Sequence, residues 1–273
     1  MISIVISTYR KDYLSILKEN IKETIGAIPY EIIEVFNPGK MGISKAYNHG
    51  AASAAFENLL FIHEDMKFLS QNWGEELLKS FELPNVGILG LAGNQKKTFL
   101  PTGHDIGLDK YRKVFIYHSE KPENDSSLKE AIPVKTLDGV FLAMKKRLWQ
   151  RLKFDEEIEG FHFYDMDISL RSSLEFQNYV LPAIKVIHFS MGNFGDEWIK
   201  SCIEFHKRNR QYNLDDISKE EKMSIRKFWY RRLMAENISF HNRLKFINKM
   251  GVDGSSISNV VKFLFNKRLL LNN

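Results

Sequence analysis

The chain has 273 residues, of which 44% are hydrophobic and 12% aromatic, and its formal net charge at pH 7 is +5. This apolar content is enough for a large core and excludes wholesale disorder. The single cysteine, Cys202, excludes a disulfide framework and a zinc-finger array, and it fits a reducing compartment. The sequence has no run of about eighteen apolar residues and no signal-peptide pattern at its start, so we expect no transmembrane helix.

The first third of the chain alternates β-branched apolar runs with segments of helical spacing. The expected strands are residues 2–7, 31–36, 59–62 and 86–91, and the expected helices are residues 12–25, 42–57 and 72–81. Parallel strands are joined by helices that cover the faces of the sheet. The sequence therefore predicts the α/β fold class, with a mostly parallel, Rossmann-like sheet flanked by helices.

The pattern weakens between residues 93 and 133. Gly, Pro, Asn and charged residues interrupt one clear strand at residues 113–118, and residues 121–129 have a loop-like composition. Loops of this kind often shape the site for a second substrate. Order then returns, with apolar runs at 134–137 and 140–144, a helical pattern at 165–176, and one or two strands within 179–189, where Pro182 interrupts the run.

The composition changes after Gly192, and we expect a domain boundary there. Residues 1–192 would form the α/β domain and residues 193–273 a basic helical extension, with candidate helices at 196–209, 220–236 and 255–271. Residues 200–273 hold 16 Lys and Arg against 7 Asp and Glu. Such a surplus can attract nucleic acid, an anionic membrane or a phosphorylated substrate. The chain lacks a helix-turn-helix, zinc or ribonucleoprotein signature, so we expect no nucleic-acid partner.

The last candidate helix combines Val, Phe and Leu with Lys262, Lys267 and Arg268 over residues 257–271. A basic amphipathic helix can lie on a membrane interface. It can equally pack on its own domain or on a second subunit of a homodimer. The sequence leaves these alternatives open.

The strand expected at residues 59–62 ends directly in His63, Glu64 and Asp65. In open α/β sheets, ligands bind just beyond the carboxyl ends of the strands, so this strand delivers acidic groups to the place where such folds bind substrate. Carboxylate oxygens and an imidazole can hold a divalent cation such as Mn²⁺ or Mg²⁺. The alternative is an acidic loop that only caps the strand.

Two further strand or helix ends carry polar groups. Asp165 and Asp167 open a predicted helix, with Arg171 one turn later, and His188 ends a strand. A carboxylate at the start of a helix complements the helix dipole. This structural role explains the presence of one Asp better than the presence of two. Aromatic neighbours would partly desolvate a carboxylate there, as suits a general base. A lone histidine is usually structural, but Asp65, Asp165 and His188 together predict one shared crevice.

In this order the residues resemble the family-2 type of nucleotide-sugar glycosyltransferase with the GT-A fold, and especially its branch of small bacterial transferases. The resemblance covers roughly residues 1–192. It is carried by residues 4–9, Asn48 and Gly50, residues 63–65 at the place of the family's Asp-x-Asp motif, Asp138 and Gly139, residues 154–156, residues 164–167, Arg171 and His188. No single element is specific to the family, whereas the ordered set is.

The resemblance implies an inverting, hexosyltransferase-like enzyme of polysaccharide biosynthesis. It implies a nucleotide-diphosphate sugar donor, expected to be of the UDP type, and a glycan or lipid-linked acceptor. It also implies a cytoplasmic location, with peripheral contact to the inner membrane face through the C-terminal helices as a hypothesis. Asp65, with His188 and His63, would bind Mn²⁺ or Mg²⁺, and Asp165 would be the catalytic base that deprotonates the acceptor hydroxyl.

The same resemblance implies the residues that contact the nucleotide sugar. Thr8 and Tyr9 would line the pocket for the base and ribose, and Glu34 or Asn37 would add a further base contact. Asp138 would face the sugar or the acceptor. The remaining residues expected to contact the donor are Asn48, Asp167 and Arg171.

The chain departs from the family pattern at three places. His63 replaces the first Asp of the Asp-x-Asp motif, Tyr164 stands where many relatives have an acid, and the usual Asp after the second strand is absent. His63 favours a second hypothesis, a non-catalytic nucleotide-sugar or glycan binding protein that retains the fold. A nucleotidyltransferase would need a glycine-rich phosphate loop near the first strand, and residues 7–11 contain no glycine.

Overall fold

The structure is a computed structural model that describes residues 1–118, 128–208, 212, 214–254 and 256–265. The chain divides into two compact units. Unit 1 consists of Met1–Gln95 and Lys113–Met191, and unit 2 consists of Lys96–Arg112 and Gly192–Asn273. Part of the irregular stretch between residues 93 and 133 therefore belongs to unit 2.

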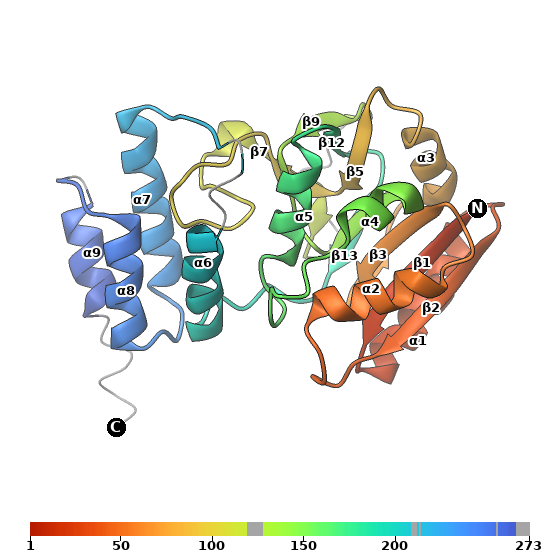
Figure 1. The fold of residues 1–273 in the computed structure, drawn as a ribbon, viewed down its shortest axis with the longest axis horizontal. Helices are drawn as coiled ribbons and strands as arrows, with labels where there is room; N and C mark the ends of the chain where they lie inside the picture. Colours follow the sequence, from red (N-terminus) through yellow and green to blue (C-terminus); the bar gives the residue numbers. More distant parts are fainter. Residues whose placement is uncertain (119–127, 209–211, 213, 255, 266–273) are drawn as a thin grey trace. The chain divides into compact units, whose positions relative to one another are not determined.

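Unit 1 is built on a seven-stranded sheet with the order β2-β1-β3-β11-β5-β12-β9 (Figure 1). The strands are β1 (Ile2–Thr8), β2 (Tyr30–Phe36), β3 (Asn58–His63), β5 (Val86–Gly90), β9 (Ile132–Val134), β11 (Phe141–Lys145) and β12 (Gln177–Val180). β1 pairs in parallel with β2 and β3, and β12 pairs in parallel with β5. β11 and β9 run antiparallel to their neighbours. The predicted α/β class with a mostly parallel sheet is confirmed.

Helices cover both faces of this sheet. The helices are α1 (Lys11–Thr24), α2 (Ile43–Ser53), α3 (Trp73–Ser80), α4 (Lys146–Leu152) and α5 (Tyr164–Ser172). Apolar residues of α1 and α3 join one core cluster, and those of α2, α4 and α5 join the other. Figure 1 shows α2, α4 and α5 in front of the sheet. Helix α4 was not expected from the sequence.

The two-sided cover explains why the strand before His63 is a continuous apolar run. Leu60 and Ile62 point into the core shared with α1 and α3, whereas Leu59 and Phe61 point into the core on the other face. All four side chains are fully buried. Burying each one contributes roughly 1.5–3 kcal/mol to stability, so the strand cannot shift without loss of either core.

Two three-stranded sheets complete the strands of the described residues. One has the order β4-β13-β8 and the other β10-β6-β7. The strands are β4 (Met66–Phe68), β6 (Ala92–Asn94), β7 (Arg112–Val114), β8 (Ile116–Tyr117), β10 (Thr136–Leu137) and β13 (Val186–His188). The strand predicted at residues 113–118 is in fact split at Phe115, whose amide donates to the carbonyl of Leu91 at 2.9 Å. Most of the loop predicted at residues 121–129 lies outside the described residues.

Unit 2 is helical, with η1 (Asp109–Tyr111), α6 (Asp196–Arg208), α7 (Lys219–Leu233), α8 (Phe240–Met250) and α9 (Ile257–Leu264). The rings of Tyr230, Phe246 and Phe263 pack together at the contact of α7, α8 and α9. α8 was not expected, and the end of the helix predicted at residues 255–271 lies outside the described residues. Within the described part of the chain, no helix has the length and apolar character needed to cross a membrane.

Candidate functional site

The register of the small sheet β4-β13-β8 brings Asp65 and His188 together. β3 ends at His63, and after a two-residue turn the chain begins β4 at Met66. β4 pairs antiparallel with β13, so that His188 lies opposite Met66. The amide of Phe189 then donates to the carbonyl of Asp65 at 3.0 Å. A pairing between distant strands thus places the predicted ligands side by side.

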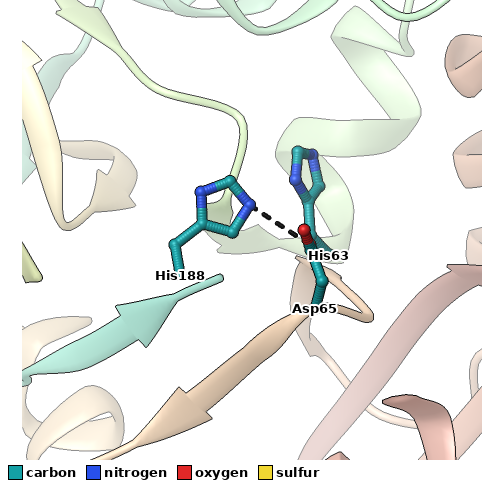
Figure 2. Close-up of side chains that lie close together, drawn as sticks. All are labelled: His63, Asp65 and His188. Carbon is teal, nitrogen blue, oxygen red and sulfur yellow. Dashed lines mark hydrogen bonds and ion pairs between the residues drawn. The ribbon is translucent and has the colours of Figure 1, made fainter. Parts of the chain in front are cut away.

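Figure 2 shows the side chains of His63, Asp65 and His188 gathered at the ends of these strands. Nε2 of His188 lies 3.2 Å from Oδ1 of Asp65, and the two imidazole rings have centroids 5.5 Å apart. One ligand atom from each residue lies within 4.8 Å of the others. Two imidazole nitrogens and one carboxylate oxygen at this spacing are able to hold a divalent cation.

The charges of these groups suit a cation. Burial alone would raise the pKa of Asp65, but the hydrogen bond to His188, the charges of His188 and His63, and Ser190 together bring it to about 2. Burial, helped by repulsion from His188, lowers the pKa of His63. At neutral pH the carboxyl is therefore ionised and the His63 imidazole neutral, which are the forms that bind a metal.

The beginning of α5 lies beside this cluster. The hydroxyl of Tyr164 is 2.9 Å from Nε2 of His63, and Asp165 is the next residue. Oδ1 of Asp165 accepts a hydrogen bond from the amide of Met166 at 2.8 Å. The opening turn of α5 therefore contacts His63 through Tyr164, and Asp165 follows in the same turn. The crevice predicted to be shared by Asp65, Asp165 and His188 stays a prediction.

Gly139, the residue after Asp138, contacts the start of α5. The carbonyl of Gly139 accepts a hydrogen bond from Tyr164 at 3.1 Å, and a Cβ on Gly139 would lie 3.2 Å from the Cβ of Asp165. Oδ1 of Asp138 accepts from the amide of Val140 at 2.9 Å, which fixes the turn before β11. The turn at residues 138–139 therefore lies against the start of α5.

Glu64 is a residue whose role the sequence did not reveal. Its buried carboxylate accepts hydrogen bonds from the hydroxyl of Thr8 and from the amides of Tyr9 at 3.2 Å and Arg10 at 3.1 Å. Thr8 is itself buried, whereas Tyr9 is 64% exposed. Glu64 thus holds the turn after β1, a contact between segments more than fifty residues apart that no local pattern could announce.

The other predicted donor contacts near β2 lie in two different surroundings. Glu34 forms an exposed ion pair with Lys18 at 2.7 Å. Asn37 is buried, and its side chain exchanges two hydrogen bonds with the backbone of Met41, at 2.9 and 3.1 Å. The backbone amide of Asn37 donates to the carbonyl of Thr8 at 2.7 Å. Asn37 therefore ties the turn after β2 to the turn after β1.

Asn48 has a protein partner at each of its hydrogen-bonding positions. Its amide nitrogen donates to the carbonyl of Phe154 at 2.8 Å and to Glu156 at 3.0 Å. Its oxygen accepts from the indole of Trp149 and from the amide of Phe154, both at 3.0 Å. An amide side chain has two donors and two acceptor positions, so this geometry favours a structural role. The predicted contact of Asn48 with the nucleotide sugar stays a prediction.

Asp167 and Arg171 form an internal ion pair. Nε of Arg171 donates to Oδ2 of Asp167 at 2.8 Å, and Asp167 is 3% exposed. The guanidinium also donates to the carbonyls of Leu152 at 2.5 Å and Lys153 at 2.7 Å, at the end of α4. These hydrogen bonds join α5 to α4 and favour a structural role for both residues. Their predicted contact with the nucleotide sugar stays a prediction.

The seven-stranded sheet, with polar groups gathered where its strands end, is the GT-A fold of glycosyltransferases. A crystal structure of S. aureus TarS, residues 1–349, in complex with UDP-GlcNAc matches with a TM-score of 0.53 and 12% identity over 96% of this chain and 79% of that one. A crystal structure of GalNAc-T7 with UDP, GalNAc and Mn²⁺ matches with a TM-score of 0.50 and 12% identity. It covers 69% of this chain, which spans only 43% of that structure's chain.

Identities this low show the likeness of the fold alone. The sequence itself matches the Glycosyltransferase like family over residues 15–217, which is most of the chain. The protein therefore belongs to this family and is a glycosyltransferase. No curated protein matches it. The family assignment favours the enzyme over the alternative of a non-catalytic binding protein.

Proposed function

We propose that this glycosyltransferase is an inverting enzyme that moves a sugar from a nucleotide-diphosphate sugar to an acceptor hydroxyl. The observation that carries the proposal is the convergence of three candidate metal ligands within 4.8 Å, beside the helix whose first turn contains Asp165. A donor of the UDP type is supported by the two structural neighbours, whose crystals contain UDP-GlcNAc and UDP. Asp165 is the proposed base.

The donor set fits a divalent cation held by His63, Asp65 and His188. Two imidazoles and one carboxylate suit Mn²⁺ better than Mg²⁺, which prefers a shell of oxygen ligands. We therefore expect Mn²⁺ to be the more effective ion. The bound cation would supply a Lewis acid that offsets the negative charge developing on the departing nucleoside diphosphate.

The chain's own residues would prepare the acceptor and the donor. The Asp165 carboxylate would accept the proton of the acceptor hydroxyl as its oxygen attacks the anomeric carbon, which is general-base catalysis in a single displacement. The exposed ring of Tyr9 is available to stack on the base of the nucleotide. Glu64 would support this contact, because it holds the amides of Tyr9 and Arg10.

The test of the proposal is transfer or hydrolysis of UDP-sugars with Mn²⁺ present. Replacement Asp165→Asn removes the base and is expected to lower turnover roughly 10²- to 10⁴-fold, while binding of the donor measured by calorimetry changes little. Asp109→Asn, at a fully exposed carboxylate of unit 2, is the matched control and should leave turnover unchanged. Full activity of Asp165→Asn, or no binding of any UDP-sugar by the wild type, would contradict the proposal.

The same proposal places the acceptor side of the reaction at an anionic membrane surface. Unit 2 exposes an apolar stripe on α8, on α9 and at the C-cap of α9, made of Phe240, Leu244, Ile257, Val261 and Phe265. The rings of Phe240 and Phe265 lie 6.4 Å apart, so the two helices form one continuous stripe. Spacing of four residues puts each set on one side of its helix.

The charges beside the stripe select the partner. The described residues of α8 and α9 include the exposed Lys245, Lys249 and Lys262 and contain no Asp or Glu. Because the charged residues described on these two helices are all cations, the stripe complements a surface of anionic lipids, where apolar burial and charge attraction act together. A lipid-linked acceptor would be met at such a surface.

Flotation with vesicles tests this contact. The full chain should float with vesicles that contain phosphatidylglycerol and much less with pure phosphatidylcholine. Val261→Glu and Leu244→Glu should each weaken binding about 10-fold or more, because each removes roughly 1.5–3 kcal/mol of apolar burial. Phe99→Glu, at an exposed ring in residues 96–112, is the control. Absence of flotation, with a dimer that the same variants dissociate, would assign the stripe to a second copy of the chain.

A further inference from the structure

The contact between Tyr164 and His63 restricts where the imidazole can carry its proton. The hydroxyl of Tyr164 lies 2.9 Å from Nε2 of His63 and 3.1 Å from the carbonyl oxygen of Gly139. A carbonyl only accepts hydrogen bonds, and a phenol has a single proton to donate. Tyr164 therefore donates to Gly139, and Nε2 of His63 must be the donor to the phenol oxygen.

The opposite arrangement is unfavourable. If Tyr164 donated to His63, its own oxygen would face the carbonyl oxygen of Gly139 at 3.1 Å with no proton between them. Tyr164 is 3% exposed, so water has little room to relieve this contact. An unmade hydrogen bond in such a place costs about 1–3 kcal/mol. The neutral His63 ring is thus held with its proton on Nε2 and its lone pair on Nδ1.

Packing fixes the phenol in the position where it can do this. The ring of Tyr164 lies 5.8 Å from that of Tyr47 and 6.1 Å from that of Phe154, both of them buried. Gly139 is required for the close approach, because a Cβ at this position would overlap the Tyr164 hydroxyl. Neither the phenol nor the carbonyl that accepts its hydrogen bond is free to shift.

Nδ1 is then the nitrogen of His63 that can serve as a ligand. Figure 2 shows a ring nitrogen of His63 on the side that faces His188. We propose that Tyr164 is a positioning residue that holds His63 in the Nε2–H tautomer, so that Nδ1 presents its lone pair toward Asp65 and His188. This inference rests on the proposed metal site. A partner on the second nitrogen of a ligand histidine fixes both its tautomer and its orientation.

Two measurements on the full chain test the role of Tyr164. Long-range proton–nitrogen spectra of ¹⁵N-histidine protein distinguish the two tautomers, with the His63 signals assigned by their loss in His63→Gln. The metal-free wild type should show the Nε2–H form. Tyr164→Phe keeps the ring and removes the hydroxyl, so the Nδ1–H form, which can donate toward the Asp65 carboxylate, should gain population. Mn²⁺ affinity in calorimetry should fall roughly 10- to 100-fold.

Tyr179→Phe is the matched control, since Tyr179 also donates its hydroxyl to a backbone carbonyl, that of Pro84, at 3.0 Å. It should leave the His63 spectrum and the Mn²⁺ affinity unchanged. An Nδ1–H tautomer in the wild type would overturn the proposal without any variant, even if Tyr164→Phe failed to fold. Equal Mn²⁺ affinity of Tyr164→Phe and wild type would overturn it too. Absence of Mn²⁺ binding by the wild type would instead overturn the metal of the proposed function.

Discussion

Each unit of the protein contains a cluster of titratable side chains with histidine, and the two clusters differ in what their polar atoms face. In unit 1, atoms of His63, Asp65 and His188 converge to within 4.8 Å of one another. In unit 2, the cluster consists of Lys97, Cys202 and His206. Nζ of the fully buried Lys97 donates to the carbonyl of Thr102 at 2.9 Å and to its hydroxyl at 2.6 Å. The first cluster leaves ligand atoms directed at one point, whereas in the second the ammonium is held by neighbouring oxygens.

The pKa shifts follow the same division. In unit 1, burial also lowers the pKa of His63, but the hydrogen bond from His188 and the neighbouring groups bring the pKa of Asp65 to about 2 despite its burial, so this cluster keeps an anion. In unit 2, burial lowers the pKa of Lys97 to about 7, lowers that of His206 and raises that of Cys202. There burial drives every group toward its neutral form. Nearness of titratable groups is thus not enough for a cation site, which also needs a group that stays anionic and ligand atoms that converge.

The largest effect is expected at the internal ion pair of α5. Arg171→Met would remove the guanidinium that pairs with the buried carboxylate of Asp167, so the free energy of unfolding should fall by about 3–5 kcal/mol. Chemical denaturation measures this loss. Arg151→Met breaks an exposed ion pair with Glu175 and should cost less than about 1 kcal/mol. Unchanged stability of Arg171→Met, combined with weakened donor binding, would instead place Arg171 in the donor site.

Asp65→Asn tests the open cluster directly. The variant removes the one anionic ligand, so Mn²⁺ affinity measured by calorimetry should fall more than about 100-fold, beyond the range typical of a supporting residue. Chelation with EDTA should abolish turnover of the wild type, and added Mn²⁺ should restore it better than Mg²⁺. Asp109→Asn should bind Mn²⁺ as the wild type does. Wild-type affinity in Asp65→Asn would exclude this cluster as the metal site.

Glu64→Gln tests the contact that holds the turn after β1. The amide can no longer accept all the bonds that Thr8, Tyr9 and Arg10 donate, so the variant should lose about 1–3 kcal/mol of stability. Because the same turn carries Tyr9, KM for the donor should rise more than kcat falls. Glu57→Gln, at an exposed side chain outside this network, is the control. A kcat effect with unchanged KM and stability would contradict a role in positioning the turn.

The smallest effect is a pH dependence that comes from unit 2. Between pH 7 and 10.5, Lys97 is protonated in the unfolded chain but increasingly neutral in the folded protein, so this group contributes a rise of the free energy of unfolding with pH. The slope contributed by this group is at most about 1.4 kcal/mol per pH unit. Lys97→Met should reduce the slope in denaturation curves, and Lys222→Met, at an exposed side chain of α7, should not. An equal slope in Lys97→Met and wild type would show that Lys97 does not lose its proton in this pH range.

The sequence alone predicted the sheet and most of its helices, because these depend on local periodicity. The continuous apolar run of β3 indicated burial on both faces, and its abrupt end at His63 and Asp65 indicated a ligand site. The place of Asp165 in the first turn of α5 was equally visible. Elements with weak patterns were missed: α4 is short, β4 has three residues, and α8 follows a stretch rich in polar residues.

The contacts that build the site were decided by tertiary structure. The pairing of β4 with β13 sets His188 beside Asp65, although the two residues are separated by 123 positions. Glu64 and Tyr164 acquire their partners only when β1, β3 and α5 meet. Residue types at strand ends are fixed by the sequence, but hydrogen bonds between distant segments depend on the register and packing of the folded chain, which no local pattern encodes.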